Sequence, residues 1–134
     1  MLIDRPIYDE EHTIFRGAVR KFYEQEAAPY AEEWAKAGMV SREFWYKAGE
    51  AGLLCPQLPE EYGGVGGDYR LNAVVNEEQA YNRASGAALA VHSDIVAPYI
   101  LDFGSDDLKD RILPKTITRE MVGAIAQTEP ATSR

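Results

Sequence analysis

Apolar residues recur at intervals of three and four along the first part of the chain, and this spacing constrains the fold more than any other feature. Between Glu10 and Lys36 they fall at Ile14, Phe15, Ala18, Val19, Phe22, Tyr23, Tyr30, Ala31 and Trp34. This is the period of an α-helix with one buried side. Pro29 lies inside the pattern and has no amide donor, so we predict a kink or a break into two helices near Ala28. Gly38 closes the segment.

Two further helices are predicted from their capping residues. Ser41 can cap a short helix that ends at about Gly52 and turns Phe44, Trp45, Ala48 and Leu53 inward. Asp68 can cap a helix that runs to about Arg83. Its apolar stripe of Leu71, Val74, Val75 and Tyr81 is predicted to lie opposite Asn72, Asn76, Glu77 and Arg83.

Helix-breaking residues fill the segment between these two helices. They are Pro56, Pro59, Gly63, Gly64, Gly66 and Gly67. Such a segment cannot hold a regular helix, so we predict an ordered loop. The apolar residues within it, among them Leu58 and Tyr62, indicate packing against the helices rather than a linker between domains.

The stretch from Ala87 to Leu101 is apolar on most of its circumference, which predicts a helix in the centre of a bundle. It is not predicted to span a membrane, because Asp94 and Pro98 interrupt it. Gly104 ends the stretch, and Ser105 opens another helix in which Pro114 marks a late bend or the end.

After Arg119 the pattern changes to a short apolar run, 121–126, without helical spacing. This run predicts a single buried strand. A lone strand leaves its main-chain groups unpaired, so we expect a sheet to follow in a larger protein. The predicted fold is therefore an all-α bundle of about five to six helices, residues 1–120, followed by the truncated start of a β-domain, residues 121–134.

Composition excludes several classes of function. The net charge of -8, without a cluster of Lys or Arg, argues against a nucleic-acid surface. The single Cys55 excludes an internal disulfide, and His12 and His92 lie far apart, so no metal site is predicted. The N-terminus shows neither a secretory signal nor a transit peptide. We expect a reducing compartment, either the bacterial cytoplasm or, for a processed eukaryotic protein, the mitochondrial matrix.

Several short motifs together resemble the N-terminal part of acyl-CoA dehydrogenases. They are the loop 59–64 (PEEYGG), the pair Glu77-Glu78, the stretch 91–93 (VHS), the pair Gly104-Ser105 and the closing 128–130 (TEP). The segments 40–43, 76–81 and 123–126 are most similar to long-chain members. The resemblance covers nearly the whole chain but only the opening part of a typical family member.

This resemblance implies a helical domain, a middle β-barrel and a C-terminal helical bundle, with FAD as cofactor. It also implies a homotetramer that oxidises acyl-CoA in fatty acid β-oxidation and passes electrons to an electron-transfer flavoprotein. In the family a glutamate removes the α-proton while the β-hydrogen leaves as hydride to the flavin. That glutamate belongs to the C-terminal domain, so no catalytic residue is assigned here and the chain alone is expected to be inactive.

The resemblance assigns flavin contacts to Thr128 and to Ile125, a position that is often aromatic in the family. It assigns the wall of the acyl channel to Ala87, Val91 and Ile95. The alternatives are that Thr128 only satisfies its own main chain and that the three channel residues are ordinary core contacts. The family continues beyond Pro130 with a glycine- and serine-containing turn that ends in aspartate. The sequence 131–134 (ATSR) departs from this pattern, so stable FAD binding by this chain is not expected.

Two polar residues are predicted to be structural. His92 is interpreted as a hydrogen-bonded helix residue rather than a base or ligand, and Glu78 as a buried carboxylate with a partner. Two alternative functions remain. One is a non-catalytic helical interaction module, or partial subunit, that pairs with a full-length chain. The other is an acyl-CoA oxidase or flavin monooxygenase on the same scaffold.

Overall fold

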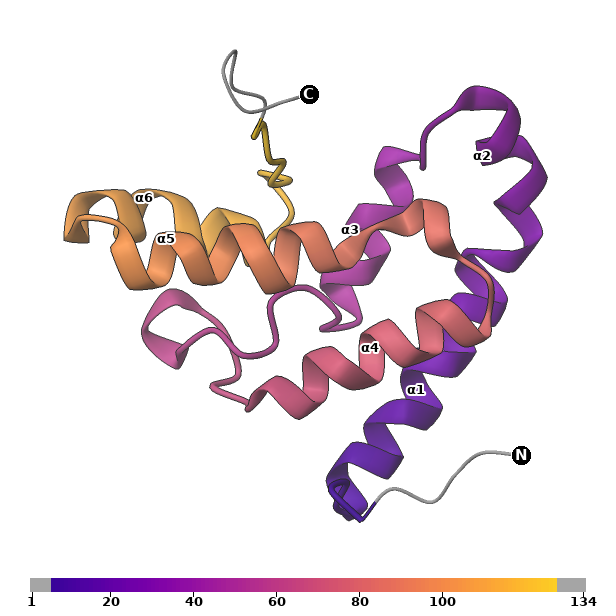
Figure 1. Ribbon diagram of the computed structural model, residues 1–134, viewed down its shortest axis with the longest axis horizontal. Helices are drawn as coiled ribbons and strands as arrows, with labels where there is room; N and C mark the ends of the chain where they lie inside the picture. The colour runs from indigo at the N-terminus through magenta and orange to yellow at the C-terminus, as the bar shows by residue number, and fades with distance from the viewer. Residues whose placement is uncertain (1–5, 128–134) are drawn as a thin grey trace.

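The computed structural model describes residues 6–127, and this part of the chain is helical and contains no β-strand (Figure 1). Its α-helices are α1 (Glu10–Glu26), α2 (Ala31–Ala37), α3 (Arg42–Glu50), α4 (Tyr69–Tyr81), α5 (Ala97–Phe103) and α6 (Asp106–Ile117). Three single-turn 3-10 helices (Ala28–Tyr30, Glu60–Tyr62 and Ser85–Ala87) and a π-helical segment (Val91–Val96) complete the fold. The predicted all-α class is confirmed.

The first long segment divides where Pro29 predicts it. Helix α1 ends at Glu26, the 3-10 turn Ala28–Tyr30 carries Pro29 in its first turn, and α2 begins at Ala31. Proline cannot donate to the preceding turn, so the hydrogen-bond ladder is interrupted there. Helix α2 ends at Ala37 and is followed by Gly38, whose φ of 72° lies in the left-handed region that favours glycine.

The three predicted capping residues begin the helices assigned to them. The Ser41 hydroxyl accepts a hydrogen bond from the Phe44 amide, the Asp68 carboxylate from Arg70, and the Ser105 hydroxyl from Leu108. Each side chain satisfies a main-chain donor that the first helical turn leaves unpaired. Helix α6 continues to Ile117, so Pro114 lies inside its last turn and does not end it.

Two clusters of buried residues form the core of the described chain. The larger lies where α1 crosses α4 and α3 closes one side (Figure 1). It consists of Val19, Phe22, Tyr23, Ala27, Phe44, Ala48, Leu53, Leu54, Val74, Val75, Ala87 and Leu89. The smaller, Cys55, Leu58, Ala97 and Leu113, lies between the loop before α4 and the antiparallel pair α5 and α6. The breaker-rich loop is therefore packed, as predicted.

The predicted faces of α4 are partly wrong. Asn72, expected on the polar face, is buried, and Tyr81, expected in the apolar stripe, is 59% exposed. Asn72 is buried because α4 is covered on a second side by the π-helical segment, where its amide donates to Asp94. The Tyr81 ring remains outside, with the Arg20 guanidinium 4.2 Å from its centre.

The apolar stretch from Ala87 to Leu101 is not one helix in the centre of the bundle. Ala88 adopts a left-handed conformation, with φ of 38°, which separates the 3-10 turn before it from the helix after it. The following helix contains the π-helical segment and leaves one side uncovered by the described chain. Ile95, Tyr99 and Phe103 are 47%, 66% and 75% exposed. In Figure 1, α5 and α6 lie side by side, away from α1 and α2.

The strand predicted at 121–126 is not formed. Residues 122–127 have no regular secondary structure, and the described chain forms no strand with which they could pair. This segment leaves the end of α6 and passes the π-helical segment at Gly123. None of the helices between residues 6 and 127 combines the length and the apolar character needed to cross a bilayer.

Candidate functional site

The three predicted channel residues do not share one surface. Ala87 is buried in the larger core, Val91 is half-buried, and Ile95 is exposed. The left-handed residue Ala88 stands between Ala87 and the helix that carries the other two. Ala87 therefore has the burial of a core residue and Ile95 does not, and the assignment of all three residues to the acyl channel stays a prediction.

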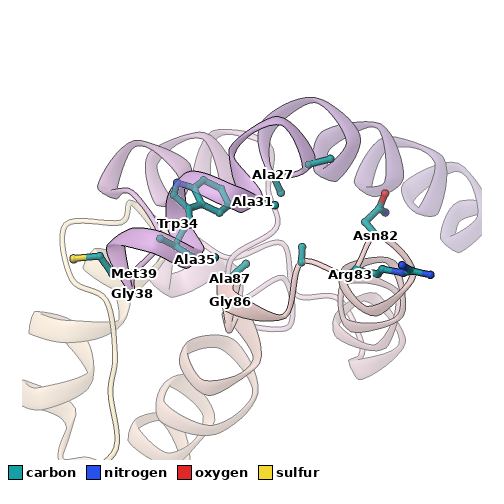
Figure 2. Close-up of a pocket in the computed structure, with 13 residues that line it drawn as sticks. Ala27, Ala31, Trp34, Ala35, Gly38, Met39, Asn82, Arg83, Gly86 and Ala87 are labelled. Atoms are coloured by element: carbon teal, nitrogen blue, oxygen red, sulfur yellow. The ribbon is translucent and has the colours of Figure 1, made fainter.

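A cleft of about 400 Å³ lies beside Ala87, between α2 and the end of α4 (Figure 2). Small apolar residues form most of its wall, among them Ala27, Ala31 and Gly86. Trp34 stands on the α2 side, and Asn82 lies on the opposite side at the end of α4, as Figure 2 shows. The volume is in the usual range for ligand pockets, roughly 300 to 1,000 Å³. Most of the lining is apolar, and Asn82 and Arg83 add polar groups on the α4 side.

The open face of the following helix is a second apolar surface. We define it by Ile95, Tyr99 and Phe103, which follow one another at intervals of four and so share one side of the helix. The rings of Tyr99 and Phe103 are 5.1 Å apart. The spacing is visible in the sequence, but an apolar stripe indicates burial and does not say what covers it.

His92 connects two segments that lie after it in the chain. Its Nε2 is 2.9 Å from the carbonyl oxygen of Thr116, near the end of α6, and its Nδ1 accepts a hydrogen bond of 2.9 Å from the Gly123 amide. The Trp45 ring meets the imidazole edge to face. Burial lowers the pKa of His92, so the neutral imidazole is favoured. The prediction of a hydrogen-bonded structural histidine is confirmed, but no pattern near His92 indicates its contact with Gly123.

Polar residues also fill the space between the π-helical segment and the elements beside it. The Asp94 carboxylate accepts hydrogen bonds from the amides of Asn72 and Asn76, and it raises the pKa of Tyr69. Ser93 accepts a hydrogen bond of 3.1 Å from the main chain of Cys55. These contacts tie the segment to α4 on one side and to the loop before α4 on the other.

Glu78 is buried and paired, as predicted. Arg20 binds both of its carboxylate oxygens, at 2.7 Å and 2.9 Å, and Arg16 binds one of them at 3.0 Å. Both arginines belong to α1, so the group joins α1 to α4. A carboxylate held by two guanidinium groups is an acceptor in an ion-pair network, so both of its oxygens are already engaged.

Asp9, Glu11 and His12 lie close enough together to offer three ligand atoms to a metal ion. The His12 Nδ1 already accepts a hydrogen bond from the Asp9 amide, at 3.3 Å, and completes the N-terminal cap of α1. The two carboxylates are exposed. This arrangement is explained by helix capping, and we assign no metal site to it.

The predicted flavin contacts can be followed only in part. Ile125 is 40% exposed on the segment after α6, and Thr128 lies outside the described residues. Within the described chain, no main-chain group of residues 124–127 has a hydrogen-bond partner. An apolar side chain and open main-chain groups fit the edge of a flavin ring. The assignment of Ile125 and Thr128 to the flavin stays a prediction.

The described residues thus define an all-helical domain with an apolar cleft, an open helix face and structural, rather than catalytic, buried polar groups. Residues 9–120 match the family model described as "Acyl-CoA dehydrogenase, N-terminal domain", and the chain belongs to this family. It is 49% identical over 126 residues to the long-chain specific acyl-CoA dehydrogenase, mitochondrial, of Rattus norvegicus. That match covers 94% of this chain and 29% of the rat protein.

Solved structures give the same result. The acyl-CoA dehydrogenase from Geobacillus kaustophilus is 43% identical with a TM-score of 0.91, over 97% of this chain and 34% of that one. An acyl-CoA dehydrogenase complexed with FAD from Bacillus anthracis is 28% identical with a TM-score of 0.80, over 98% of this chain and 23% of that one. The chain thus spans only a minor part of the length of its relatives.

Proposed function

We propose that this chain is the N-terminal helical domain, residues 1–120, with the first residues of a middle β-domain, 121–134, of an FAD-dependent acyl-CoA dehydrogenase. The whole enzyme oxidises long-chain acyl-CoA thioesters to 2-enoyl-CoA in fatty acid β-oxidation. One observation carries the proposal: the 49% identity with a long-chain enzyme extends over 94% of the chain. The FAD named in the Bacillus anthracis structure supports the choice of cofactor.

The chain's own share in this reaction is to bind and orient. In the proposed enzyme Ile125 and Thr128 contact the flavin, and Ile95 and Val91 line the acyl channel. The exposure of Ile125 and Ile95 supports these roles, because both side chains are free to meet a ligand or another domain. We place the part of the channel beside Ala87 at the cleft, because most of the wall there is made of small apolar residues that suit an aliphatic chain.

The proton-abstracting carboxylate is not among the residues of this chain. Glu78 is held by two arginines, so it does not take that role. The chain by itself is therefore expected to lack both dehydrogenase activity and stable FAD. The proposed enzyme is a homotetramer that delivers electrons to an electron-transfer flavoprotein, in the bacterial cytoplasm or the mitochondrial matrix.

A chimera tests the proposal. This chain replaces the matching 126-residue segment of the rat long-chain enzyme. The chimera is expected to be yellow and to reduce an electron-accepting dye with palmitoyl-CoA, whereas the isolated chain with added FAD shows no turnover. A folded chimera without flavin absorption, or with flavin but without turnover, would contradict the proposal. Turnover by the isolated chain would contradict the assignment of the base to another part of the enzyme.

The position of the channel is tested in the same chimera with Gly86→Val. A Cβ at Gly86 meets nothing closer than Val40, at 3.8 Å, so a larger side chain fits and fills the cleft. The ratio of kcat/KM for palmitoyl-CoA to that for butyryl-CoA is expected to fall several-fold. Gly17→Ala, in the exposed part of α1, is the matched control. If the ratio of the two kcat/KM values is unchanged in the Gly86→Val variant, the cleft is not part of the acyl channel.

The open face of Ile95, Tyr99 and Phe103 favours a second candidate, the helical interaction module. An exposed apolar surface of this kind promotes association with another chain. Sedimentation of the isolated chain separates the two candidates. If the isolated chain is a monomer and the chimera is active, the chain is a domain of the enzyme. A stable complex with a full-length dehydrogenase subunit, formed through this face and without gain of activity, supports the module.

A further inference from the structure

One imidazole joins the π-helical segment to two later parts of the chain. His92 is fully buried, and its ring nitrogens lie 2.9 Å from the Thr116 carbonyl oxygen and 2.9 Å from the Gly123 nitrogen. Thr116 is itself fixed, because its hydroxyl donates to the Leu113 carbonyl at 2.6 Å. His92 therefore holds residue 123 against the end of α6.

The two partners allow only one form of the imidazole. The Gly123 amide is a donor, so Nδ1 must carry a lone pair, and the Thr116 carbonyl is an acceptor, so Nε2 must carry the proton. This is the neutral Nε2–H tautomer. Because burial favours the neutral ring, the environment supports the form that the hydrogen bonds require.

The main chain at Gly123 lies directly on the π-helical segment. A Cβ at this position would be 2.6 Å from a methyl carbon of Val96, so the close approach requires glycine. Before it, the Met121 amide donates to the Lys115 carbonyl at 3.1 Å. After it, the described residues up to 127 have no hydrogen bond, and Ile125 follows two positions later.

We propose that His92 is a positioning residue that fixes where the segment 122–127 leaves the helical domain, and so sets the position of the flavin-contacting residue Ile125. The second half of this statement rests on the proposed function. The first half concerns only the hydrogen bond between His92 and Gly123. Each half has its own measurement.

Two substitutions separate the hydrogen bonds of His92. His92→Asn keeps an acceptor at the place of Nδ1 and loses the group that reaches Thr116. His92→Gln keeps a donor near the place of Nε2 and loses the acceptor for Gly123. The two variants therefore differ in which bond they keep while removing the same ring from the core.

NMR on the 134-residue chain tests the hydrogen bond directly. A scalar coupling between the Gly123 nitrogen and the His92 Nδ1 is expected in the wild-type chain. Amide exchange at Gly123 is expected to accelerate on the order of tenfold in His92→Gln, as for the loss of one hydrogen bond, and to change little in His92→Asn. No coupling, or equal acceleration in both variants, would overturn the proposal.

Gly123→Ala provides an independent variant if His92→Gln does not fold. Its Cβ overlaps Val96 and moves the segment away without altering the histidine. The His92 Nδ1 resonance is expected to move to the position of a nitrogen without a hydrogen-bond donor, while the Nε2 resonance stays. A Nδ1 resonance that remains in place would show that Gly123 is not its partner.

The flavin absorption band of the rat chimera tests the second half. His92→Gln is expected to shift this band and to lower kcat more than it raises KM, because the ring contact moves while the acyl site is unchanged. His92→Asn should restore both. If the Gly123 amide loses its hydrogen bond and the flavin absorption band does not shift, His92 does not set the position of Ile125. A chimera without flavin would refute the proposed function and leave the NMR result standing.

Discussion

The Nε of Arg20 lies 2.7 Å from the carboxylate of Glu78, although Glu78 is only 1% exposed. Arg20 itself is 27% exposed, so the ion pair joins a buried carboxylate to a partly exposed guanidinium group. It joins α1 to α4, the two helices with the most extensive packing in the described chain. The pair therefore bears on the stability of the domain rather than on its chemistry.

We predict that Glu78→Gln lowers the free energy of unfolding by about 2 to 3 kcal/mol, because it leaves two guanidinium groups facing a neutral amide. Urea denaturation followed by circular dichroism measures the change. Glu24→Gln, on the exposed side of α1, is the control and should stay within about 0.5 kcal/mol of the wild type. Equal effects of the two substitutions would show that the buried pair contributes nothing specific.

The thiol of Cys55 is predicted to be inert in the folded chain. It is fully buried, and burial raises its pKa to about 11, so little thiolate exists at pH 8. A thiol reagent at pH 8 should label the native protein only at the rate of its opening, and should label the unfolded protein at once. Complete labelling of native protein within the mixing time would place the thiol on an accessible surface.

Two glycines are predicted to respond in opposite directions to the same added methyl group. Gly17, inside α1, has no atom near its Cβ position, so Gly17→Ala should stabilise the chain by about 1 kcal/mol. At Gly64 the Cβ would lie 2.0 Å from the Leu58 carbonyl oxygen, so Gly64→Ala should destabilise it by about 2 to 3 kcal/mol. Thermal unfolding of both variants measures the changes. Stabilisation at both positions would contradict the close approach of the loop.

Stability is predicted to depend on pH through His92. Burial lowers its pKa in the folded chain, whereas an unfolded histidine titrates near about 6.5. Below that pH the unfolded chain binds a proton that the folded chain does not, so the contribution of His92 is present above about pH 6.5 and is lost as the pH falls. The difference in unfolding free energy between wild type and His92→Asn should therefore be larger at pH 8 than at pH 5. A difference that grows toward pH 5 would mean that the folded chain holds the imidazolium.

The helix boundaries were predictable because local chemistry determines them. Ser41, Asp68 and Ser105 each bind an amide within three residues, and Gly38 takes a conformation that few other residues adopt. No distant contact is needed to infer such features. For the same reason, the break around Pro29 could be placed to within a few residues.

The errors arise where distant contacts decide. Asn72 is buried because Asp94 reaches it from another element, and nothing near Asn72 in the sequence indicates this. The spacing of Ile95, Tyr99 and Phe103 is visible in the sequence, but nothing near these residues indicates that the described chain leaves this face uncovered.

In the candidate site too, features that depend on nearby residues could be predicted, and features that depend on distant residues could not. The roles of Glu78 and His92 as partnered polar residues follow from their place in apolar helices, whereas the partners Arg20 and Gly123 do not. The assignments of Ala87, Val91, Ile95 and Ile125 to ligands stay predictions. Thr128 lies outside the described residues, so its role depends on experiment alone.

The two buried clusters of the described chain are unequal, with twelve residues in the larger and four in the smaller. A region with little buried apolar surface opens at a lower free energy than the whole domain. Helices α5 and α6 should therefore form a separate cooperative unit whose amides exchange before those of α1 and α4. His92 is hydrogen-bonded to Thr116 in this unit, and the segment after α6 leads to Ile125. A partner that binds there would therefore increase the order of the less stable part of the domain.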